Sequence, residues 1–459
     1  MARNFFLFLA LFLALATGAL AEDWPQFLGP RANATSTETN LLDTWPESGP
    51  PILWQKTLGA GYGSPSILGC RLVVHHRVDD DEIIECLDPA TGASLWRHAY
   101  PSHFVDPYGY NNGPRATPAL FSDRCYAFGA EGKLTCLDLA SGRLVWQRDT
   151  AADWTIPTAF FGVGSSPLLE DGRLIVMVGG QPNAGVVAFD PATGKTLWQS
   201  VGQKNWEGRP MTGWRGDRIV SWQTWEKQAS YSTPVAATIH DRRQILCLMR
   251  QGLVSLNPTN GDVNFSFWFR APQNESVNAM QPVVSGDSIL ISSAYYKTGS
   301  VLLRVAPDSH SVQEIWRGLT LELHWMTPIC LDGFLYAFSG RNEPDARFRC
   351  VEFSTGRLLW DRDESWQRYS PDTPAVYGRG SLLLADGKLY ALGEGGLLGI
   401  FQPSTDAPKE ICRAQIPGLR HPCWAAPVLA NRRLYLRGED RLVCLDLAKN
   451  LSHEQRPGR

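Results

Sequence analysis

The segment Asp88-Pro-Ala-Thr-Gly-Ala-Ser-Leu-Trp96 decides the fold, because its pattern returns along the chain with the same spacing. An acidic residue, a glycine four places later and a tryptophan four places after the glycine recur at 138–146, 190–198 and 352–360. Glycine takes a positive φ at no steric cost, so the first half of the pattern predicts a tight turn. The tryptophan then lies on the next strand, where its large apolar face can pack on a neighbouring sheet. The positions assigned to this structural repeat are Trp54, Asp88, Gly92, Trp96, Asp138, Gly142, Trp146, Asp190, Gly194, Trp198, Trp316, Gly356 and Trp360.

A second element precedes each copy and consists of a residue, usually small, followed by proline. An apolar strand residue stands seven places after the proline in almost every copy, and only the fourth copy carries an insertion before Ile245. The dipeptides are Ser64-Pro65, Thr117-Pro118, Ser166-Pro167, Thr233-Pro234, Gln281-Pro282, Thr327-Pro328 and Ala426-Pro427, with Ser381-Leu382 in the remaining place. Eight copies at a spacing of roughly fifty residues are typical of propeller blades.

Each copy is expected to contain four short strands. In the third copy these are 165–169, 173–178, 185–189 and 196–199, separated by Gly, Asp and Pro turns. The middle strands are apolar at consecutive positions, which indicates burial on both faces, as in radially stacked sheets. We therefore predict an all-β, eight-bladed β-propeller of four-stranded antiparallel blades. A parallel β-helix is the alternative, but its coils are shorter than these units.

The eighth copy predicts how the ring closes. It runs through 441–446 and ends without a fourth strand or its tryptophan, whereas 51–57, which contains Trp54, resembles an orphan fourth strand. Pairing the two segments would satisfy both sheet edges. The predicted organisation is a signal peptide at 1–21, a Pro/Gly-rich lead-in at 22–49, the propeller at 50–450 and a C-terminal tail at 451–459.

The first residues predict export. Arg3 precedes the apolar stretch 5–16, and Ala19-Leu20-Ala21 has the small-x-small pattern of a cleavage site, so we expect a periplasmic or secreted protein. An uncleaved anchor is the alternative. The first cysteine is Cys70, which argues against a lipoprotein. Lys and Arg number 43 against 46 Asp and Glu, with no basic stripe, so nucleic acid is not an expected partner. No later stretch has the apolar length of a membrane-spanning helix, and we expect a monomer.

The repeats resemble those of the PQQ-like (pyrroloquinoline quinone-type) propellers, a superfamily that includes quinoprotein alcohol dehydrogenases and the outer-membrane assembly factor BamB. The segment Asp23-Trp-Pro-Gln-Phe-Leu-Gly-Pro30 also resembles the start of exported members. The resemblance covers 23–450 and implies the fold, but one fold hosts both enzymes and scaffolds. The quinoprotein dehydrogenases carry adjacent cysteines beside the quinone, and many carry a Cys-x-x-Cys-His haem motif. This sequence has neither motif, and their calcium ligands are not matched here residue by residue.

Cysteines recur at one repeat position, two residues before the acid or its equivalent. Because Ala188 and Ser255 stand at the same place in other copies, a small core-facing slot explains the pattern better than disulfides. Two disulfides are kept as alternatives, Cys125–Cys136 and Cys412–Cys423. None of the cysteines has metal-ligand spacing, so no metal site is predicted. The repeated cysteines are Cys86, Cys136, Cys350 and Cys444.

Loops that lead into the innermost strands should converge at one end of the central channel. They are rich in aromatic, Arg and Asn side chains, which suit a planar, anionic or carbohydrate-like ligand. The alternative is that these side chains only seat neighbouring blades. The binding candidates are Asn111, Asn112, Arg115, Trp154, Lys227, His324, Trp325, Arg379 and Trp424, and Asp106 is a weak catalytic candidate.

Two functions from different classes follow. The favoured one is a non-catalytic binding or scaffold protein that holds a protein or envelope polymer at the channel mouth. The alternative is a PQQ- and calcium-dependent oxidoreductase acting on alcohols or sugars. In that enzyme the quinone would stack on Trp154, Trp325 or Trp424, Arg115 or Arg379 would pair its carboxylates, and Asp106 would be the base. A carbohydrate-binding role is a third possibility.

Overall fold

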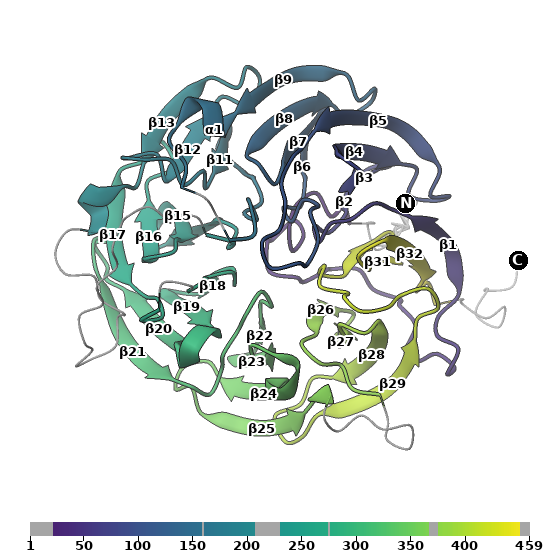
Figure 1. The fold of residues 1–459 in the computed structure, drawn as a ribbon. Coiled ribbons are helices and arrows are strands. Elements are labelled where there is room, and N and C mark those ends of the chain that lie inside the picture. Colours follow the sequence, from purple (N-terminus) through teal and green to yellow (C-terminus); the bar gives the residue numbers. More distant parts are fainter. Residues whose placement is uncertain (1–21, 158–159, 207–229, 274–275, 367–374, 450–459) are drawn as a thin grey trace, which may run out of the picture.

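The chain folds into eight four-stranded sheets arranged around a central axis, as the computed structural model shows (Figure 1). Each sheet is antiparallel throughout, so the predicted eight-bladed propeller is confirmed. The structure describes residues 22–157, 160–206, 230–273, 276–366 and 375–449. The predicted signal peptide and C-terminal tail lie outside these residues.

The blades follow one another along the chain. In blades 1 to 7 the innermost strand comes first, and blade 8 takes its outermost strand from before blade 1. Blade 1 comprises β2 (Ser66–Leu68), β3 (Arg71–Val78), β4 (Asp81–Leu87) and β5 (Ser94–Pro101), and blade 2 comprises β6 (Ala119–Phe121), β7 (Arg124–Phe128), β8 (Lys133–Asp138) and β9 (Leu144–Asp149). Blade 3 comprises β10 (Leu168–Glu170), β11 (Arg173–Val176), β12 (Val186–Phe189) and β13 (Thr196–Ser200), and blade 4 comprises β14 (Val235–Ile239), β15 (Arg242–Leu248), β16 (Gly252–Leu256) and β17 (Val263–Trp268). Blade 5 comprises β18 (Val283–Ser285), β19 (Ser288–Ser293), β20 (Gly299–Val305) and β21 (Val312–Gly318), and blade 6 comprises β22 (Ile329–Leu331), β23 (Phe334–Ser339), β24 (Arg347–Glu352) and β25 (Leu358–Asp363). Blade 7 comprises β26 (Ser381–Ala385), β27 (Lys388–Leu392), β28 (Leu397–Gln402) and β29 (Lys409–Gln415), and blade 8 comprises β30 (Val428–Ala430), β31 (Arg433–Arg437), β32 (Arg441–Asp446) and β1 (Ile52–Thr57).

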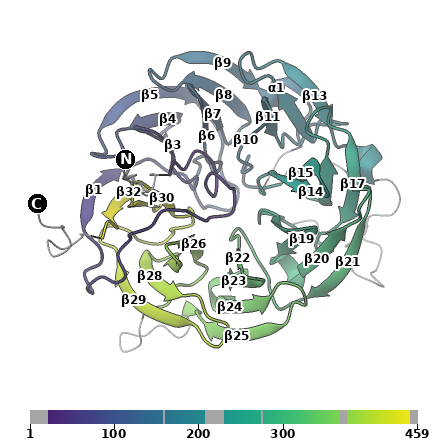
Figure 2. The same ribbon diagram turned by 180° about the vertical axis from the view of Figure 1, so that it is seen from behind.

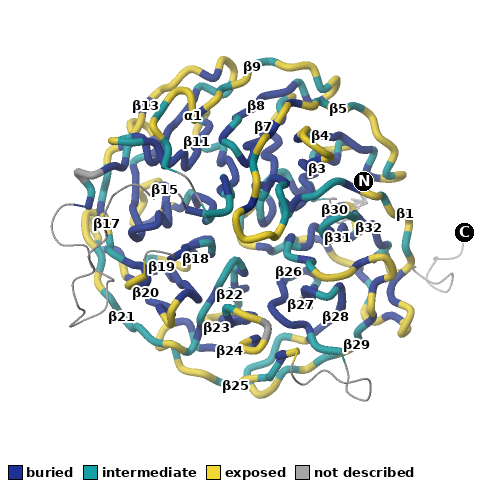
Figure 3. Tube along the Cα trace, in the orientation of Figure 1, coloured by how far each residue is buried: buried dark blue, intermediate teal, exposed yellow. Residues whose placement is uncertain are grey.

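Helix is scarce in the part of the chain that the structure describes. It consists of α1 (Thr150–Asp153) and three 3₁₀ turns at Gln203–Trp206, Tyr295–Lys297 and Glu343–Asp345. None of these helices is long and apolar enough to cross a membrane. Figure 3 shows that the middle strands of the blades are largely buried, whereas the outermost strands carry exposed positions.

The N-terminal strand closes the ring as expected. β1 pairs antiparallel with β32, with Trp54 opposite Cys444 and Thr57 opposite Arg441. In Figure 1 the purple β1 therefore lies beside the yellow blade 8. Strands from the two ends of the propeller sequence are thus paired within one sheet, so blade 8 leaves no edge of the ring unpaired.

The repeated tryptophans join six of the eight blades to the next one. Trp54 donates its indole N–H to the carbonyl of Pro89 at 3.1 Å and packs on Gly92 in the same turn. A Cβ at Gly92 would stand 2.6 Å from the Trp54 ring, and its φ is +71°, so both packing and conformation require glycine. The same indole-to-carbonyl bond is made by Trp96, Trp146, Trp198, Trp316 and Trp360.

The repeated cysteines fill small positions opposite these tryptophans. Cys86 is paired across the sheet with Trp96 and Cys136 with Trp146, and both cysteines are fully buried. All ten cysteines are free thiols, so both candidate disulfides are wrong. Cys125 packs with the core between blades 1 and 2, whereas Cys136 packs with the core between blades 2 and 3. The two thiols therefore lie on opposite faces of one sheet.

The lead-in closes one end of the channel, which the sequence did not predict. Its Trp24 exchanges two backbone hydrogen bonds with Ile67 in β2, and Ser36 donates its N–H to the carbonyl of Leu384 in β26 at 2.8 Å. The Glu38 carboxylate then accepts the backbone N–H groups of the turn between β30 and β31. Figure 2 shows the purple lead-in looping through the centre of the ring and then running outward to β1.

Candidate functional site

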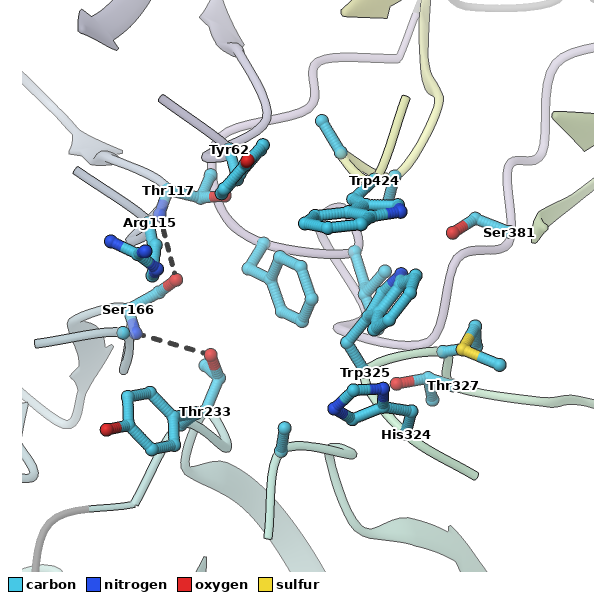
Figure 4. Close-up of a pocket in the computed structure, with 18 of the residues that line it drawn as sticks. Tyr62, Arg115, Thr117, Ser166, Thr233, His324, Trp325, Thr327, Ser381 and Trp424 are labelled. Atoms are coloured by element: carbon cyan, nitrogen blue, oxygen red, sulfur yellow. Dashed lines mark hydrogen bonds between the residues drawn. The ribbon is translucent and has the colours of Figure 1, made fainter. Parts of the chain in front are cut away.

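A cavity of about 180 Å³ lies on the propeller axis and opens at the end of the channel opposite the lead-in. All eight blades contribute to its wall, and the lead-in supplies its floor through Phe27 and Leu28. We call this cavity the axial pit (Figure 4). Its polar and aromatic lining comprises Tyr62, Tyr110, Arg115, Thr117, Phe161, Ser166, Tyr231, Thr233, Tyr295, His324, Trp325, Thr327, Arg379, Ser381 and Trp424.

The deeper wall of the axial pit is a partial ring of hydroxyl groups from five blades, Thr117, Ser166, Thr233, Thr327 and Ser381. The first four precede repeated prolines, and proline holds the residue before it in an extended conformation. The Thr117 N–H donates to Ser166 Oγ at 3.0 Å, and the Ser166 N–H donates to Thr233 Oγ1 at 3.3 Å. Figure 4 shows these two bonds running from blade to blade. The dipeptides found in the sequence thus set both the entry of each inner strand and the lining of the pit.

The upper wall is aromatic, and we call it the aromatic collar. Trp424 has ring-centroid distances of 4.9 Å to Tyr62 and 5.1 Å to Trp325. His324 follows at 4.6 Å from Trp325 and lies 5.0 Å from Tyr295. The other side of the collar consists of Tyr110, Phe161 and Tyr231. In Figure 4, Trp325 and Trp424 face the open centre from the side opposite Arg115 and Ser166.

A buried carboxylate behind the collar binds both Trp424 of the collar and the neighbouring Arg379. Glu394 has no solvent-exposed surface; it accepts the Trp424 indole N–H at 3.0 Å and pairs with Arg379 at 2.8 Å. Burial alone would raise the pKa of Glu394, but hydrogen bonds from His421 and Arg379 outweigh it and hold the pKa at about 2. The Arg379 guanidinium lies 4.8 Å from the Trp325 ring. Glu394 is not among the predicted site residues, because its only signal in the sequence is a lone acidic residue among glycines just after β27.

The second arginine of the pit is also paired. Arg115 forms a salt bridge with the buried Asp106, whose other oxygen accepts the Tyr108 N–H at 2.7 Å. Burial lowers the pKa of Arg115, and the Asp106 carboxylate partly offsets this effect. The guanidinium lies 5.6 Å from the Tyr62 ring. Asp106, the weak candidate for a catalytic base, therefore anchors this loop and its arginine.

His324 is half-buried in the wall of the pit, and its ring is uncharged. Burial, reinforced by Arg379 and Arg341, lowers its pKa to about 3. Its Nε2 lies 3.1 Å from the Tyr295 hydroxyl. A side chain with such a low pKa is a weak base at neutral pH.

The structure brings half of the predicted site residues together. Those on the wall of the pit are Arg115, His324, Trp325, Arg379 and Trp424. Asn111 donates to Glu439 at 2.8 Å, and Asn112 accepts the Asp106 N–H at 2.8 Å, so both hold the surrounding loop. Trp154 lies after α1 and donates to Gln199 in the outer strand β13, away from the pit. Lys227 lies outside the described residues.

The donor set of the pit does not suit calcium. Calcium takes six to eight oxygen ligands, among which carboxylates are prominent. Among the residues that the structure describes, no Asp, Glu, Asn or Gln side chain lines the pit, and no cluster of three or more His, Cys, Asp or Glu could hold a metal. The hydroxyl ring and the two paired arginines do not replace such ligands. We therefore derive no chemistry from a quinone–calcium pair at this site.

Comparison with known proteins supports the repeat assignment. A family model described as outer membrane protein assembly factor BamB matches residues 32–151 and 80–362. The chain belongs to this PQQ-like propeller family. The propeller is also 27% identical over 162 residues to the dehydrogenase subunit of an alcohol dehydrogenase (quinone) from Gluconobacter oxydans, which covers 32% of this chain and 21% of that protein. The chain thus spans about a fifth of the length of the curated relatives it matches.

Two solved structures share the propeller architecture. The quinohemoprotein alcohol dehydrogenase from Comamonas testosteroni has a TM-score of 0.64 at 12% identity, covering 95% of this chain and 82% of its own. BamB from Moraxella catarrhalis has a TM-score of 0.53 at 14% identity, covering 88% of this chain and 100% of its own. At these identities, the two structures share only their fold with this chain.

Proposed function

We propose that the chain is an exported, non-catalytic binding protein that holds a protruding segment of a protein or envelope-polymer partner in the axial pit. One observation carries the proposal: the pit is an aromatic surface whose charges are already compensated. Arg115 is paired with Asp106 and Arg379 with Glu394, both from behind the wall. The described lining of the pit contains no carboxylate or thiol, so it offers apolar area and hydrogen bonds rather than a reactive group.

The size of the pit favours part of a large ligand over a whole small one. Pockets that enclose a drug-sized molecule typically measure about 300–1,000 Å³, whereas this one measures about 180 Å³. Its rim continues outward as exposed aromatic side chains: Tyr108, which contacts Phe161 of the wall, is 53% and Tyr110 54% accessible. A macromolecular partner could insert a segment into the pit and cover this rim.

The test compares partner classes on the purified protein. Extended peptides and soluble cell-wall polysaccharide fragments are titrated calorimetrically against the native chain, against Trp424→Ala and against Trp154→Ala. Trp424 is in the collar, whereas Trp154 is an indole away from the pit. We expect saturable binding to one class, lost in Trp424→Ala and retained in Trp154→Ala. Equal binding by both variants, or binding to neither class, would reject the proposal.

A PQQ- and calcium-dependent oxidoreductase is the second candidate, because the relative matched over 162 residues is an alcohol dehydrogenase (quinone). Trp325 and Trp424 could stack on a planar ring, and Arg379 lies beside them. The absence of carboxylates from the lining of the pit weighs against the calcium that this chemistry would use. Reduction of a redox dye by the reconstituted protein, with an alcohol or sugar as donor, would favour this candidate.

A further inference from the structure

We infer that cleavage of the predicted signal peptide completes the fold, because the amino group that it frees at Glu22 forms a buried ion pair with Glu38. The inference goes beyond the proposed binding function and does not depend on what the axial pit holds. It follows from the position of the Glu22 nitrogen, the charge balance around Glu38 and the contacts between the lead-in and the ring.

The predicted cleavage site is the peptide bond before Glu22. Ala19-Leu20-Ala21 has the small-x-small pattern that a signal peptidase recognises. The peptidase adds water across the Ala21–Glu22 amide, which leaves a carboxylate on Ala21 and an amino group on Glu22. This amino group takes up a proton at neutral pH, because the ordinary pKa of an α-amino group is about 8. Cleavage thus converts an uncharged amide N–H into an ammonium group.

The Glu22 nitrogen already faces a buried carboxylate. It donates to Glu38 Oε1 at 3.1 Å, and Glu38 is only 2% accessible to solvent. A positive charge on this nitrogen adds a Coulomb attraction to a hydrogen bond that is already formed, and solvent screens such an attraction only weakly in a buried site. The lead-in therefore needs no rearrangement to form the ion pair.

The charge balance around Glu38 calls for a cation. Apart from the Glu22 nitrogen, its oxygens accept the backbone N–H groups of Asn431, at 2.6 Å, and Arg432. No lysine, arginine or histidine side chain in the described ranges pairs with it. A buried carboxylate without a counter-charge keeps much of its desolvation penalty. The ammonium group at Glu22 supplies the missing charge.

The side chain of Glu22 is held by partners of its own. Its two oxygens lie 2.6 and 2.9 Å from the Arg31 guanidinium, and one of them also accepts the Thr37 N–H at 2.9 Å. Arg31 therefore balances the charge of this carboxylate, and the contacts fix the backbone of Glu22. The new terminus is thus held where its ammonium group meets Glu38.

The ion pair fixes the lead-in where it connects separate blades. Trp24 is bonded to β2 of blade 1, Ser36 to β26 of blade 7, and Glu38 to the turn between β30 and β31 of blade 8. The same lead-in supplies Phe27 and Leu28 to the floor of the axial pit. Removal of the signal peptide would therefore stabilise both the closed end of the channel and the floor of the pit.

The test compares two exported forms of the full chain by hydrogen exchange and mass spectrometry. One is the native gene product, and the other carries three glycines between Ala21 and Glu22. The insertion moves the ammonium group away from Glu38 but keeps the Glu22 N–H and every side chain. We expect the native protein to begin at Glu22. In the inserted form, segments 22–41 and 428–434 should exchange about tenfold faster, as for the loss of one ionic hydrogen bond, whereas β12 in blade 3 should be unchanged.

A second pair of proteins shows whether the effect acts through the carboxylate. In Glu38→Gln, which keeps an acceptor without the charge, the insertion should change the exchange rates less than about twofold. Glu170→Gln removes a carboxylate from blade 3, and there the insertion should keep its full effect. Glu38→Asp, whose shorter side chain draws the charge away, replaces Glu38→Gln if the latter does not fold.

Three results would each overturn the inference. The first is a mature protein that begins at a residue other than Glu22. The second is equal exchange of 22–41 and 428–434 in the native and inserted forms. The third is an insertion effect that is as large in the Glu38 variant as in Glu170→Gln.

Discussion

Glu394 accepts the indole N–H of Trp424 at 3.0 Å, and this bond connects a buried carboxylate to the aromatic collar. The same carboxylate pairs with Arg379, which lies 4.8 Å from the Trp325 ring. One fully buried side chain thus positions both tryptophans of the pit, one directly and one through the arginine.

Glu394→Gln should be strongly destabilising. The substitution keeps an acceptor for Trp424 but breaks the buried ion pair between Glu394 and Arg379, which typically costs about 3–5 kcal/mol. Glu170→Gln is the matched control, because Glu170 pairs with the more exposed Arg243 and should cost less than about 1 kcal/mol. Urea unfolding measures both free energies. Similar losses in the two variants would show that Glu394 is not a buried structural charge.

Gly92→Ala should weaken the joint between blades 8 and 1. Gly92 has φ of +71°, and a Cβ there would stand 2.6 Å from Trp54. Gly172 has a similar φ of +67° with open space around its Cβ position, so Gly172→Ala isolates the conformational cost of about 1–2 kcal/mol. The clash at Gly92 should add about 1–3 kcal/mol. Equal melting temperatures for the two variants would contradict this account of the tryptophan contact.

Stability should fall at low pH through Glu82, which lies away from the pit. Burial raises the pKa of Glu82, but hydrogen bonds from His75, Tyr100 and the Ala130 N–H outweigh it and hold the pKa at about 2, below the ordinary 4.5. The stabilisation is therefore complete above pH 4.5 and is lost as the pH falls toward 2, by on the order of 3 kcal/mol.

Urea unfolding between pH 6 and pH 2.5 tests this dependence. Glu82→Gln should be less stable than the native chain at pH 6, with a difference that shrinks toward pH 2.5. A difference that does not change with pH would contradict the assignment of this carboxylate.

Thiol labelling should proceed in three stages. Cys70 is exposed, Cys330 and Cys412 are partly buried, and the other cysteines are buried. Burial raises the pKa of several buried thiols, including Cys86 to about 12, which keeps them protonated and slow to react. We expect Cys70 to react first in the native protein and all ten cysteines to react after unfolding without reductant. Fewer than ten reactive thiols in the unfolded chain would reveal a disulfide.

The blades and their closure could be predicted because their determinants are local. The acid–glycine–tryptophan spacing specifies a turn and a strand wherever it occurs, and Trp54 identified the strand that completes blade 8. The role of the lead-in was not predictable in the same way. Glu38 binds the turn at Asn431 and Arg432, and contacts across nearly four hundred residues leave no periodic signal.

The site was predicted in part for a related reason. Trp154 and Trp325 both stand in loops before an inner strand, and residue type alone does not distinguish them. The turn of α1 places Trp154 against Gln199, whereas the loop before β22 brings Trp325 to the axis. Glu394 was not predicted as a site residue because a single carboxylate becomes informative only when its partners are known.

The most direct test of the binding account compares two ligands in one thermal-unfolding experiment. A ligand that binds only the folded state raises the melting temperature by mass action. We predict that the peptide or polysaccharide fragment bound by the native chain raises its melting temperature but not that of Trp424→Ala, and that PQQ with calcium changes neither the melting temperature nor the reduction of a redox dye. Stabilisation and dye reduction with PQQ and calcium, without any effect of the fragments, would contradict it.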